Sequence, residues 1–223
     1  MNLADAAPLL LTLKVATLAT ALALVFAVAC ARALGRNEGW LRNIAESLLT
    51  LPLVLPPTVL GYYLLVVLGH QGVIGAWLHA RLGIDLIFTW QAAVIAAAVA
   101  AFPLILRAAT AAFADVDLQL EQAARTLGQN EAQVFLRVSL PLAWRGILAG
   151  TLLAFARAMG EFGATLMVAG SLPGRTQTLS IAIYNAVMAG DDDAAQAMVL
   201  VSLVAAVVVL VAAARLLTRR KPQ

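Results

Sequence analysis

Charged residues are scarce in this chain, and their scarcity excludes most classes of protein. Only 12% of the 223 residues are charged, whereas 62% are hydrophobic, and the mean hydropathy is +0.90. A soluble globular domain is about a quarter charged and about half apolar, so a soluble fold is excluded. A single cysteine excludes a disulfide scaffold, and so apolar a composition excludes intrinsic disorder. The sequence therefore predicts an integral membrane protein.

Long apolar runs, the fourth of which carries Arg157 and Glu161, predict five transmembrane helices, because a helix needs about 20 apolar residues to cross the core of a bilayer. The predicted spans are residues 9–34, 48–68, 86–107, 146–170 and 194–217. The alternation of apolar and polar residues that marks a membrane β-barrel is absent from these runs. The predicted fold is a single all-α transmembrane domain.

The positions of the basic residues predict the orientation of the spans. Eleven basic residues follow the first, third and fifth spans: Arg32, Arg36, Arg42, Arg107, Arg125, Arg137, Arg145, Arg215, Arg219, Arg220 and Lys221. The opposite loops hold only Arg81 and Arg175, with Lys14 near the N-terminal boundary. Cytoplasmic loops are enriched in Lys and Arg. The N-terminus is therefore expected outside and the C-terminus inside.

A polar segment, residues 114–145, separates the third span from the fourth. Asp115 or Asp117 can cap a first helix there, and Gly128 suits the left-handed conformation that ends it. Spacing alone leaves two interpretations open for the segment, namely a hairpin lying on the bilayer surface or a dock for a partner protein.

A second helix is expected later in the same segment. Asn130 and Gln133 have the spacing of a capping box, in which each side chain bonds the other residue's backbone N–H. Leu140-Pro141 is expected to stop this helix and to turn the chain toward the membrane.

The polar segment resembles the EAA loop of prokaryotic ABC importer permeases. That pattern reads Glu-Ala-Ala, three residues, Gly, nine residues and Ile-x-Leu-Pro. The matching residues here are Gln122, Ala123, Ala124, Gly128, Val138, Leu140 and Pro141. Gln122 stands at the Glu position, with Glu121 directly before it, and Val138 replaces Ile. The resemblance implies the type I importer permease fold and a loop that docks into an ATPase subunit.

Other stretches resemble the molybdate/tungstate branch of these permeases. They are Gly160-Glu161-Phe162-Gly163, Pro173-Gly174-Arg175, Phe88-Thr89-Trp90 and Leu55-Pro56-Pro57. The resemblance implies a multi-pass homodimer in the lipid of the inner membrane. It also implies two cytoplasmic subunits that bind ATP and magnesium, and an external binding protein that delivers molybdate. Sulfate or thiosulfate is the alternative substrate, and a membrane assembly or regulatory subunit without transport is the alternative function.

No residue pattern in the chain predicts catalysis of its own. The phosphate-binding motif Gly-x-x-x-x-Gly-Lys-Ser/Thr does not occur, so ATP hydrolysis is expected of a partner. The two histidines, His70 and His79, show no metal-ligand spacing and are expected to be ordinary loop residues. We therefore predict no enzyme activity, no cofactor, no metal site and no nucleic-acid partner for this chain.

Charges inside the fourth span form the candidate translocation site. Arg157 is expected about 16 Å into a helix that starts near Gly146, and Glu161 is expected one turn further on the same face. Gly160 and Gly163 are expected to let another backbone approach. Two interpretations stay open: a structural ion pair, or an Arg157 that faces the path and is held by Glu161.

Two consecutive prolines mark the second span. Pro56 and Pro57 remove two backbone donors and are expected to kink the helix. The kink serves either packing or the lining of a pore.

Overall fold

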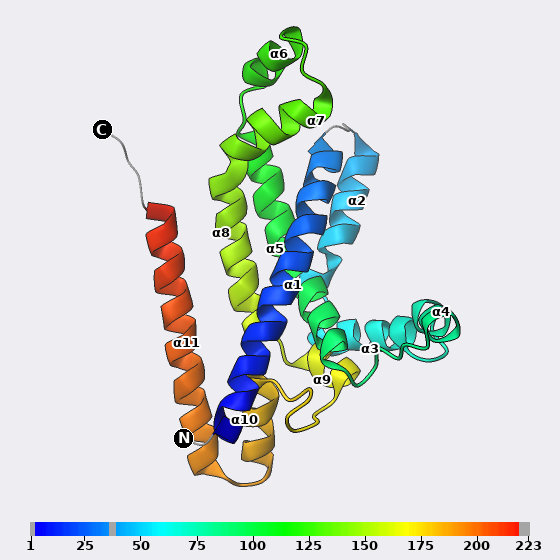
Figure 1. Ribbon diagram of the computed structural model, residues 1–223, viewed down its shortest axis with the longest axis vertical. Coiled ribbons are helices and arrows are strands. Elements are labelled where there is room, and N and C mark those ends of the chain that lie inside the picture. Colours follow the sequence, from blue (N-terminus) through cyan, green and yellow to red (C-terminus); the bar gives the residue numbers. More distant parts are fainter. Residues whose placement is uncertain (1–2, 36–38, 219–223) are drawn as a thin grey trace.

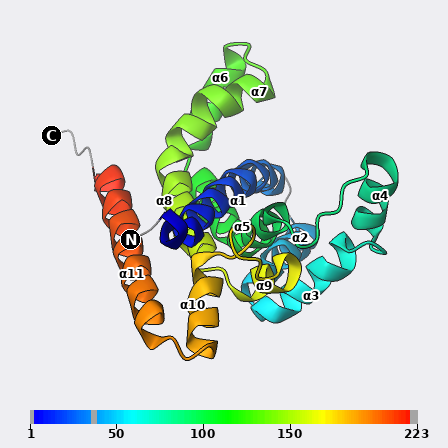
Figure 2. The same ribbon diagram turned by 60° about the horizontal axis from the view of Figure 1, so that its bottom comes forward.

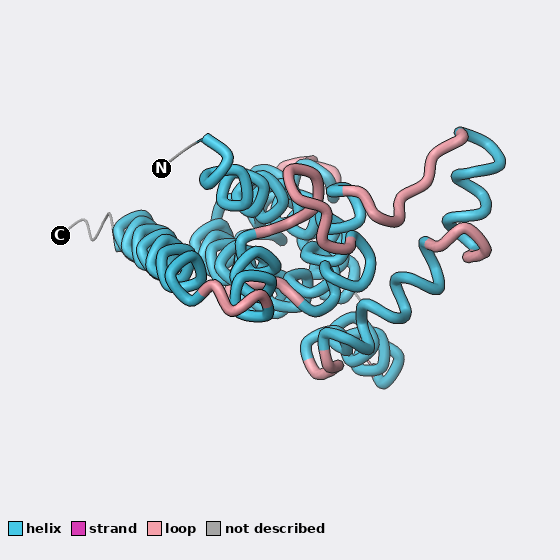
Figure 3. The backbone as a smooth tube through the Cα atoms, turned by 90° about the horizontal axis from the view of Figure 1, so that it is seen from below, coloured by secondary structure: helices cyan, strands magenta, loops and turns pink. Residues whose placement is uncertain are grey.

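The computed structural model describes residues 3–35 and 39–218, and all regular structure in these residues is helical (Figure 3). Arg36, Arg219, Arg220 and Lys221, which contributed to the predicted orientation, lie outside the described residues. The α-helices are α1 (Leu3–Gly35), α2 (Trp40–Thr50), α3 (Pro57–Leu68), α4 (Val73–Leu82), α5 (Trp90–Ala114), α6 (Leu118–Thr126), α7 (Glu131–Val134), α8 (Leu140–Met159), α9 (Gly163–Ala169), α10 (Leu179–Met188) and α11 (Asp192–Thr218).

Five stretches of these residues are helical, long and apolar enough to cross a membrane, as the sequence predicts. They are Ala6–Gly35, Pro57–Leu82, Trp90–Ala114, Glu131–Met159 and Asp192–Ala212. Helices α1 and α11 begin at the same end of the molecule and run in the same direction (Figure 1). Figure 2 shows three parts that project from the central bundle: α6 with α7, α4, and α11.

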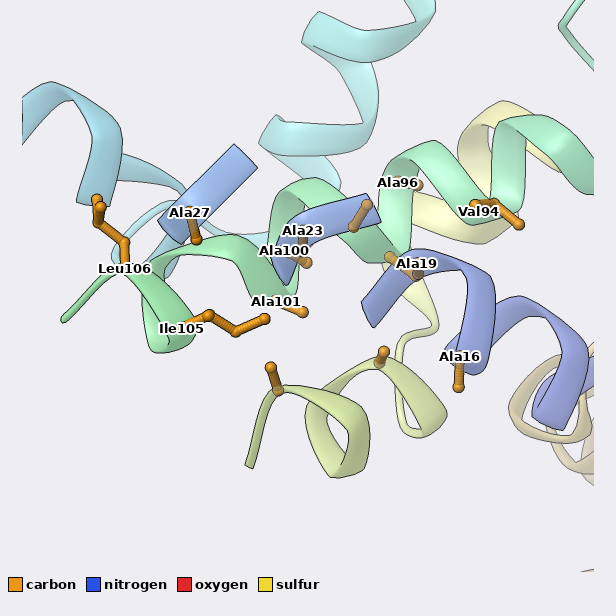
Figure 4. Packing of buried hydrophobic residues seen from close by; sticks show 14 of the residues in the cluster. Ala16, Ala19, Ala23, Ala27, Val94, Ala96, Ala100, Ala101, Ile105 and Leu106 are labelled. Carbon is orange, nitrogen blue, oxygen red and sulfur yellow. The ribbon is translucent and has the colours of Figure 1, made fainter. Parts of the chain in front are cut away.

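The core is a bundle in which α5 packs between α1 and α8. Small side chains form the contacts: Ala16, Ala19, Ala23 and Ala27 of α1 are buried, as are Ala96, Ala100 and Ala101 of α5 (Figure 4). Small residues let helix backbones approach closely, which is the main source of packing energy between helices in lipid.

Glycines give α8 the same close approach to α5. A Cβ added to Gly146 would lie 2.6 Å from Cβ of Ala112, and one added to Gly150 would clash with Cβ of Ala108. Glycine is therefore required at both positions if α5 and α8 are to stay this close.

The second predicted span, residues 48–68, does not form the single kinked helix that the sequence predicts, because the helix is interrupted there. Helix α2 ends at Thr50, a 3₁₀ turn covers Leu51–Leu53, and α3 begins at Pro57. Pro56 is extended, with φ −53° and ψ 138°. A residue before a proline is disfavoured in the helical conformation, so Pro57 forces Pro56 out of the helix.

The fourth predicted span, residues 146–170, is also wrong as one helix. Helix α8 starts at Leu140 and ends at Met159, and α9 follows only at Gly163. Arg157 thus lies in the last turn of α8, about 26 Å from its start at 1.5 Å per residue, rather than midway along it.

Leu140-Pro141 does not stop the helix that precedes it. A π-helical turn (Phe135–Ser139) joins α7 directly to α8, with the Leu140 N–H donating to the Phe135 carbonyl. In an α-helix the ring of Pro141 would clash with the preceding turn, and the wider π-helical turn occurs at this point. Pro141 then lies in the first turn of α8, where no backbone donor is needed.

Candidate functional site

The EAA-like segment forms a hairpin, residues 118–139, that projects from one end of the bundle (Figure 1). Asp117 caps α6, since its carboxylate accepts a 2.8 Å hydrogen bond from the Gln119 N–H. Gly128 has the predicted left-handed conformation, with φ +82°. Asn130 and Gln133 form the predicted capping box, with bonds of 2.9 and 3.1 Å.

A buried carboxylate lies at the base of this hairpin. Glu121 is 7% exposed. The Ser139 hydroxyl donates to its Oε1 over 2.5 Å, and Nη2 of Arg125 donates to its Oε2 over 3.0 Å. Nη1 of Arg32, at the end of α1, lies 3.6 Å from Oε1. Glu121 therefore joins α6, the turn before α8, and α1.

A second carboxylate completes the charge network. Glu131 accepts a 2.7 Å hydrogen bond from Nε of Arg125 and a 3.4 Å one from Nη2 of Arg32. The Arg32 guanidinium also lies 5.5 Å from the ring centroid of Phe135, a distance typical of a cation–π contact. Phe135 in turn packs on Phe113 near the end of α5. The hairpin is thus tied to α1 and α5.

These partners set the ionisation of Glu121. Burial by itself raises the pKa of this carboxyl, but the hydrogen bonds from Ser139 and Arg125 and the charges of Arg32 and Arg125 outweigh it. The net effect holds the pKa of Glu121 below its ordinary value of 4.5. The carboxylate is therefore ionised inside the hairpin at neutral pH.

The structure divides the remaining EAA-like residues between the interior and the surface. Ala124 is buried, Val138 and Leu140 are half-buried, and Gln122, Ala123 and Pro141 are exposed. The inward carboxylate therefore comes from the residue before the EAA Glu position.

Sequence reasoning missed most of the residues that hold Glu121. Arg125 follows Glu121 by four positions on a helix, a spacing that favours an ion pair and that the sequence displays. Arg32 carries no such signal, because it lies 99 positions from Glu131 and meets it only through the fold.

The predicted pair in the fourth span exists, but not on one continuous helix. Nη1 of Arg157 donates to Oε2 of Glu161 over 2.6 Å. Glu161 lies beyond the end of α8, is 3% exposed, and accepts a 3.0 Å hydrogen bond from the Ala164 N–H. Its carboxylate thus accepts a backbone N–H from the first turn of α9 while it pairs with Arg157.

The residues around the interruptions of the second and fourth predicted spans pack against each other. A Cβ added to Gly163 would lie 2.9 Å from Cβ of Pro57, and one added to Gly61 would lie 2.9 Å from Cα of Ala164. Gly163 therefore permits the expected close approach, by α3. Gly160 does not, since a Cβ there would lie 3.9 Å from its nearest neighbours, the carbonyl oxygens of Ala156 and Arg157.

The two histidines are not the isolated loop residues that their sequence spacing predicts. Nδ1 of His79 lies 3.0 Å and Nε2 of His70 3.3 Å from Oδ1 of Asp85. All three potential ligand atoms lie within 4.8 Å of one another. Sequence spacing gave no sign of this cluster, because the turn between α3 and α4 brings the residues together.

We predict that the stabilisation due to Glu121 disappears in acid. A group with a lowered pKa stabilises the fold above its unfolded pKa, and this contribution is lost as the pH falls through the folded pKa. At pH 7, replacing Glu121 by Gln should lower the Tm by about 3–6 °C, from about 1.5 kcal/mol for a charge-assisted bond.

Thermal unfolding in detergent at a series of pH values measures this effect. The Tm difference between the native chain and Glu121→Gln should shrink below about pH 4.5, whereas the exposed neighbour Gln122→Ala should match the native chain throughout. A Tm difference that stays constant with pH would contradict the assigned network.

We predict that Arg157→Gln destabilises the fold by about 1–3 kcal/mol, because it leaves the buried Glu161 carboxylate without its cation. Adding Glu161→Gln should restore the Tm, and Arg175→Gln, an exposed loop arginine, is the matched control. A double variant as unstable as Arg157→Gln would show that the pair is not a structural unit.

Uptake by a stable double variant separates the two interpretations of Arg157. Poor substrate uptake would place Arg157 on the translocation path, and normal uptake would show that Arg157 does not line that path.

The comparisons with known proteins agree with this architecture. Residues 15–222 match the family of binding-protein-dependent transport system inner membrane components. The molybdenum transport system permease protein ModB of Escherichia coli (strain K12) is 47% identical over 189 residues, which cover 84% of this chain and 82% of that protein. A chloroplastic sulfate permease of Chlamydomonas reinhardtii is 38% identical over 84% of this chain and 50% of its own length.

Solved structures show the same fold at low sequence identity. A bacterial ABC transporter involved in the import of the acidic polysaccharide alginate has a TM-score of 0.79 at 15% identity, covering 100% of this chain and 82% of that one. The methionine ABC transporter MetNI, in an inward-facing conformation, has a TM-score of 0.72 at 16% identity, covering 94% and 93%. The fold is therefore that of type I ABC importer permeases. Through the match over residues 15–222, the chain belongs to the family of binding-protein-dependent transport system inner membrane components.

Proposed function

We propose that this chain is the membrane-spanning subunit of a molybdate importer. The observation that carries the proposal is the 47% identity, over most of both chains, to the E. coli molybdenum permease. In this proposal two copies of the chain form the translocation path, two ATP-binding subunits supply the energy for transport, and an external binding protein supplies the oxyanion.

The electrostatics of the substrate explain why such a subunit needs an ATPase partner. Molybdate carries two negative charges, and the inside of the cell is electrically negative. Moving two charges inward costs about 4.6 kcal/mol per 100 mV of membrane potential. The chain carries no phosphate-binding motif of its own, so the energy enters through a partner.

The hairpin has the features that a docking element requires. Its surface exposes four large apolar side chains: Leu118 (68%), Leu120 (49%), Leu127 (82%) and Leu136 (60%). Its base is held by the buried Glu121 carboxylate. A hairpin that exposes apolar side chains and is fixed at its base is suited to transmit movement from a cytoplasmic partner. The positive-inside rule supports this orientation, with the hairpin in the cytoplasm and the N-terminus outside.

Sulfate is the second candidate substrate, favoured by the match to the chloroplastic sulfate permease. Both oxyanions are tetrahedral dianions, so the charges that line the translocation path cannot by themselves distinguish molybdate from sulfate.

Uptake into proteoliposomes that hold the complete transporter tests the proposal. We expect ATP-dependent uptake of radiolabelled molybdate that an excess of tungstate abolishes and the same excess of sulfate leaves largely unchanged. Vesicles without the ATPase subunit are the control. Equal competition by sulfate would assign the chain to sulfate transport, and absence of uptake for every oxyanion would favour a membrane assembly subunit instead.

A further inference from the structure

We propose that His70, His79 and Asp85 form a binding site for a divalent transition-metal cation of the zinc type. The cluster lies on the part of the chain that projects sideways from the bundle around α4 (Figures 1 and 2). It is separate from the hairpin and from the helix breaks, and the proposal does not depend on which oxyanion the chain transports.

Local structure brings the three side chains together. His70 follows the end of α3, His79 lies in the last turn of α4, and Asp85 follows that helix. Glycines tighten the turn between the helices, since a Cβ on Gly75 would clash with the carbonyls of Leu68 and Gly69. This close approach folds α4 back onto the end of α3.

A second glycine directs the chain from α4 toward Asp85. Gly83 ends α4 in the left-handed conformation, with φ +64°, and its N–H donates to the His79 carbonyl. Asp85 comes two residues later and contacts both imidazoles. The backbone therefore fixes the positions from which the three side chains converge.

The distances from the two imidazole nitrogens to the Asp85 oxygen are close to those in a tetrahedral zinc site. Ligand atoms about 2.0–2.1 Å from a tetrahedral Zn²⁺ lie roughly 3.3–3.4 Å from one another. Here His79 Nδ1 and His70 Nε2 lie 3.0 and 3.3 Å from the shared Asp85 oxygen, and all three atoms fall within 4.8 Å. Small side-chain rotations would therefore bring the three atoms into ligand positions.

The donor set selects the class of cation. Two imidazole nitrogens and one carboxylate oxygen suit zinc, nickel or copper better than calcium or magnesium, which prefer oxygen ligands. The side chains of His70, His79 and Asp85 are 62%, 47% and 54% exposed, so an ion can reach them from solvent. Three protein ligands leave a fourth position for water or for a group from another molecule.

The composition of the chain makes the proposal simple to test. The sequence contains two histidines, both in this cluster, and one cysteine, Cys30, which is half-buried in α1. The full chain, purified with a tag that contains no histidine and placed in lipid nanodiscs, is titrated with Zn²⁺ against a chromophoric chelator. We expect one Zn²⁺ per chain, and with Co²⁺ the absorption bands of a tetrahedral site.

Variants decide whether the bound metal occupies this cluster. His79→Ala and Asp85→Asn should each weaken Zn²⁺ binding by about tenfold or more, because each removes one of three ligands. The exposed Asp191→Asn is the matched acidic control, and Cys30→Ser tests for thiol binding; both should bind as the native chain does. Size-exclusion profiles and Tm values show whether each variant remains folded.

Two results would overturn the proposal. The first is the absence of stoichiometric Zn²⁺ binding by the native chain, which would leave the cluster as imidazoles bonded to a carboxylate. The second is binding that persists unchanged in folded His79→Ala and Asp85→Asn.

Discussion

The ion pairs and hydrogen bonds at the Glu121 carboxylate join α6 of the hairpin to the turn before α8 and to the end of α1. Ser139 brings the turn that leads into α8, Arg125 fixes the helix of Glu121 itself, and Arg32 brings the end of α1. A buried carboxylate without these partners would be costly, so their convergence stabilises the position of the hairpin. In the proposed function, a partner docked on the hairpin would therefore move α1 and α8 together.

Small residues hold the helices of the bundle close together. Alanines line the facing surfaces of α1 and α5, and Gly146 and Gly150 bring α8 onto the other side of α5. In lipid, such close backbone packing replaces the hydrophobic driving force that soluble bundles use. The two broken helices meet at a similar contact, where α3 and α9 approach through Gly61 and Gly163. Rigid helices joined at defined breaks suit a subunit that alternates between two shapes.

Much of this architecture follows from local signals in the sequence. Apolar runs predicted five helices that could span a membrane, and the caps at Asp117 and Asn130 and the left-handed Gly128 were visible as short motifs. Hydropathy could not show that the second and fourth runs are interrupted. Pro56-Pro57 adds no charge, and Glu161, the one charge between Gly160 and Gly163, leaves the fourth run apolar on average. The contact of Arg32 with Glu131 depends on the tertiary fold, and that of His70 with Asp85 depends on the turns on either side of α4, so neither leaves a trace in spacing.

Amide hydrogen exchange of α6 in lipid nanodiscs tests most directly whether the Glu121 carboxylate holds the hairpin to the bundle. Replacing Glu121 by Ala should raise the exchange rates of residues 118–126 by about tenfold or more, equivalent to about 1.4 kcal/mol of local stability, while α5 stays protected. Gln122→Ala, at the exposed neighbouring position, should leave these rates unchanged. Equal exchange in both variants would contradict the account, because the hairpin would then keep its place without the buried carboxylate.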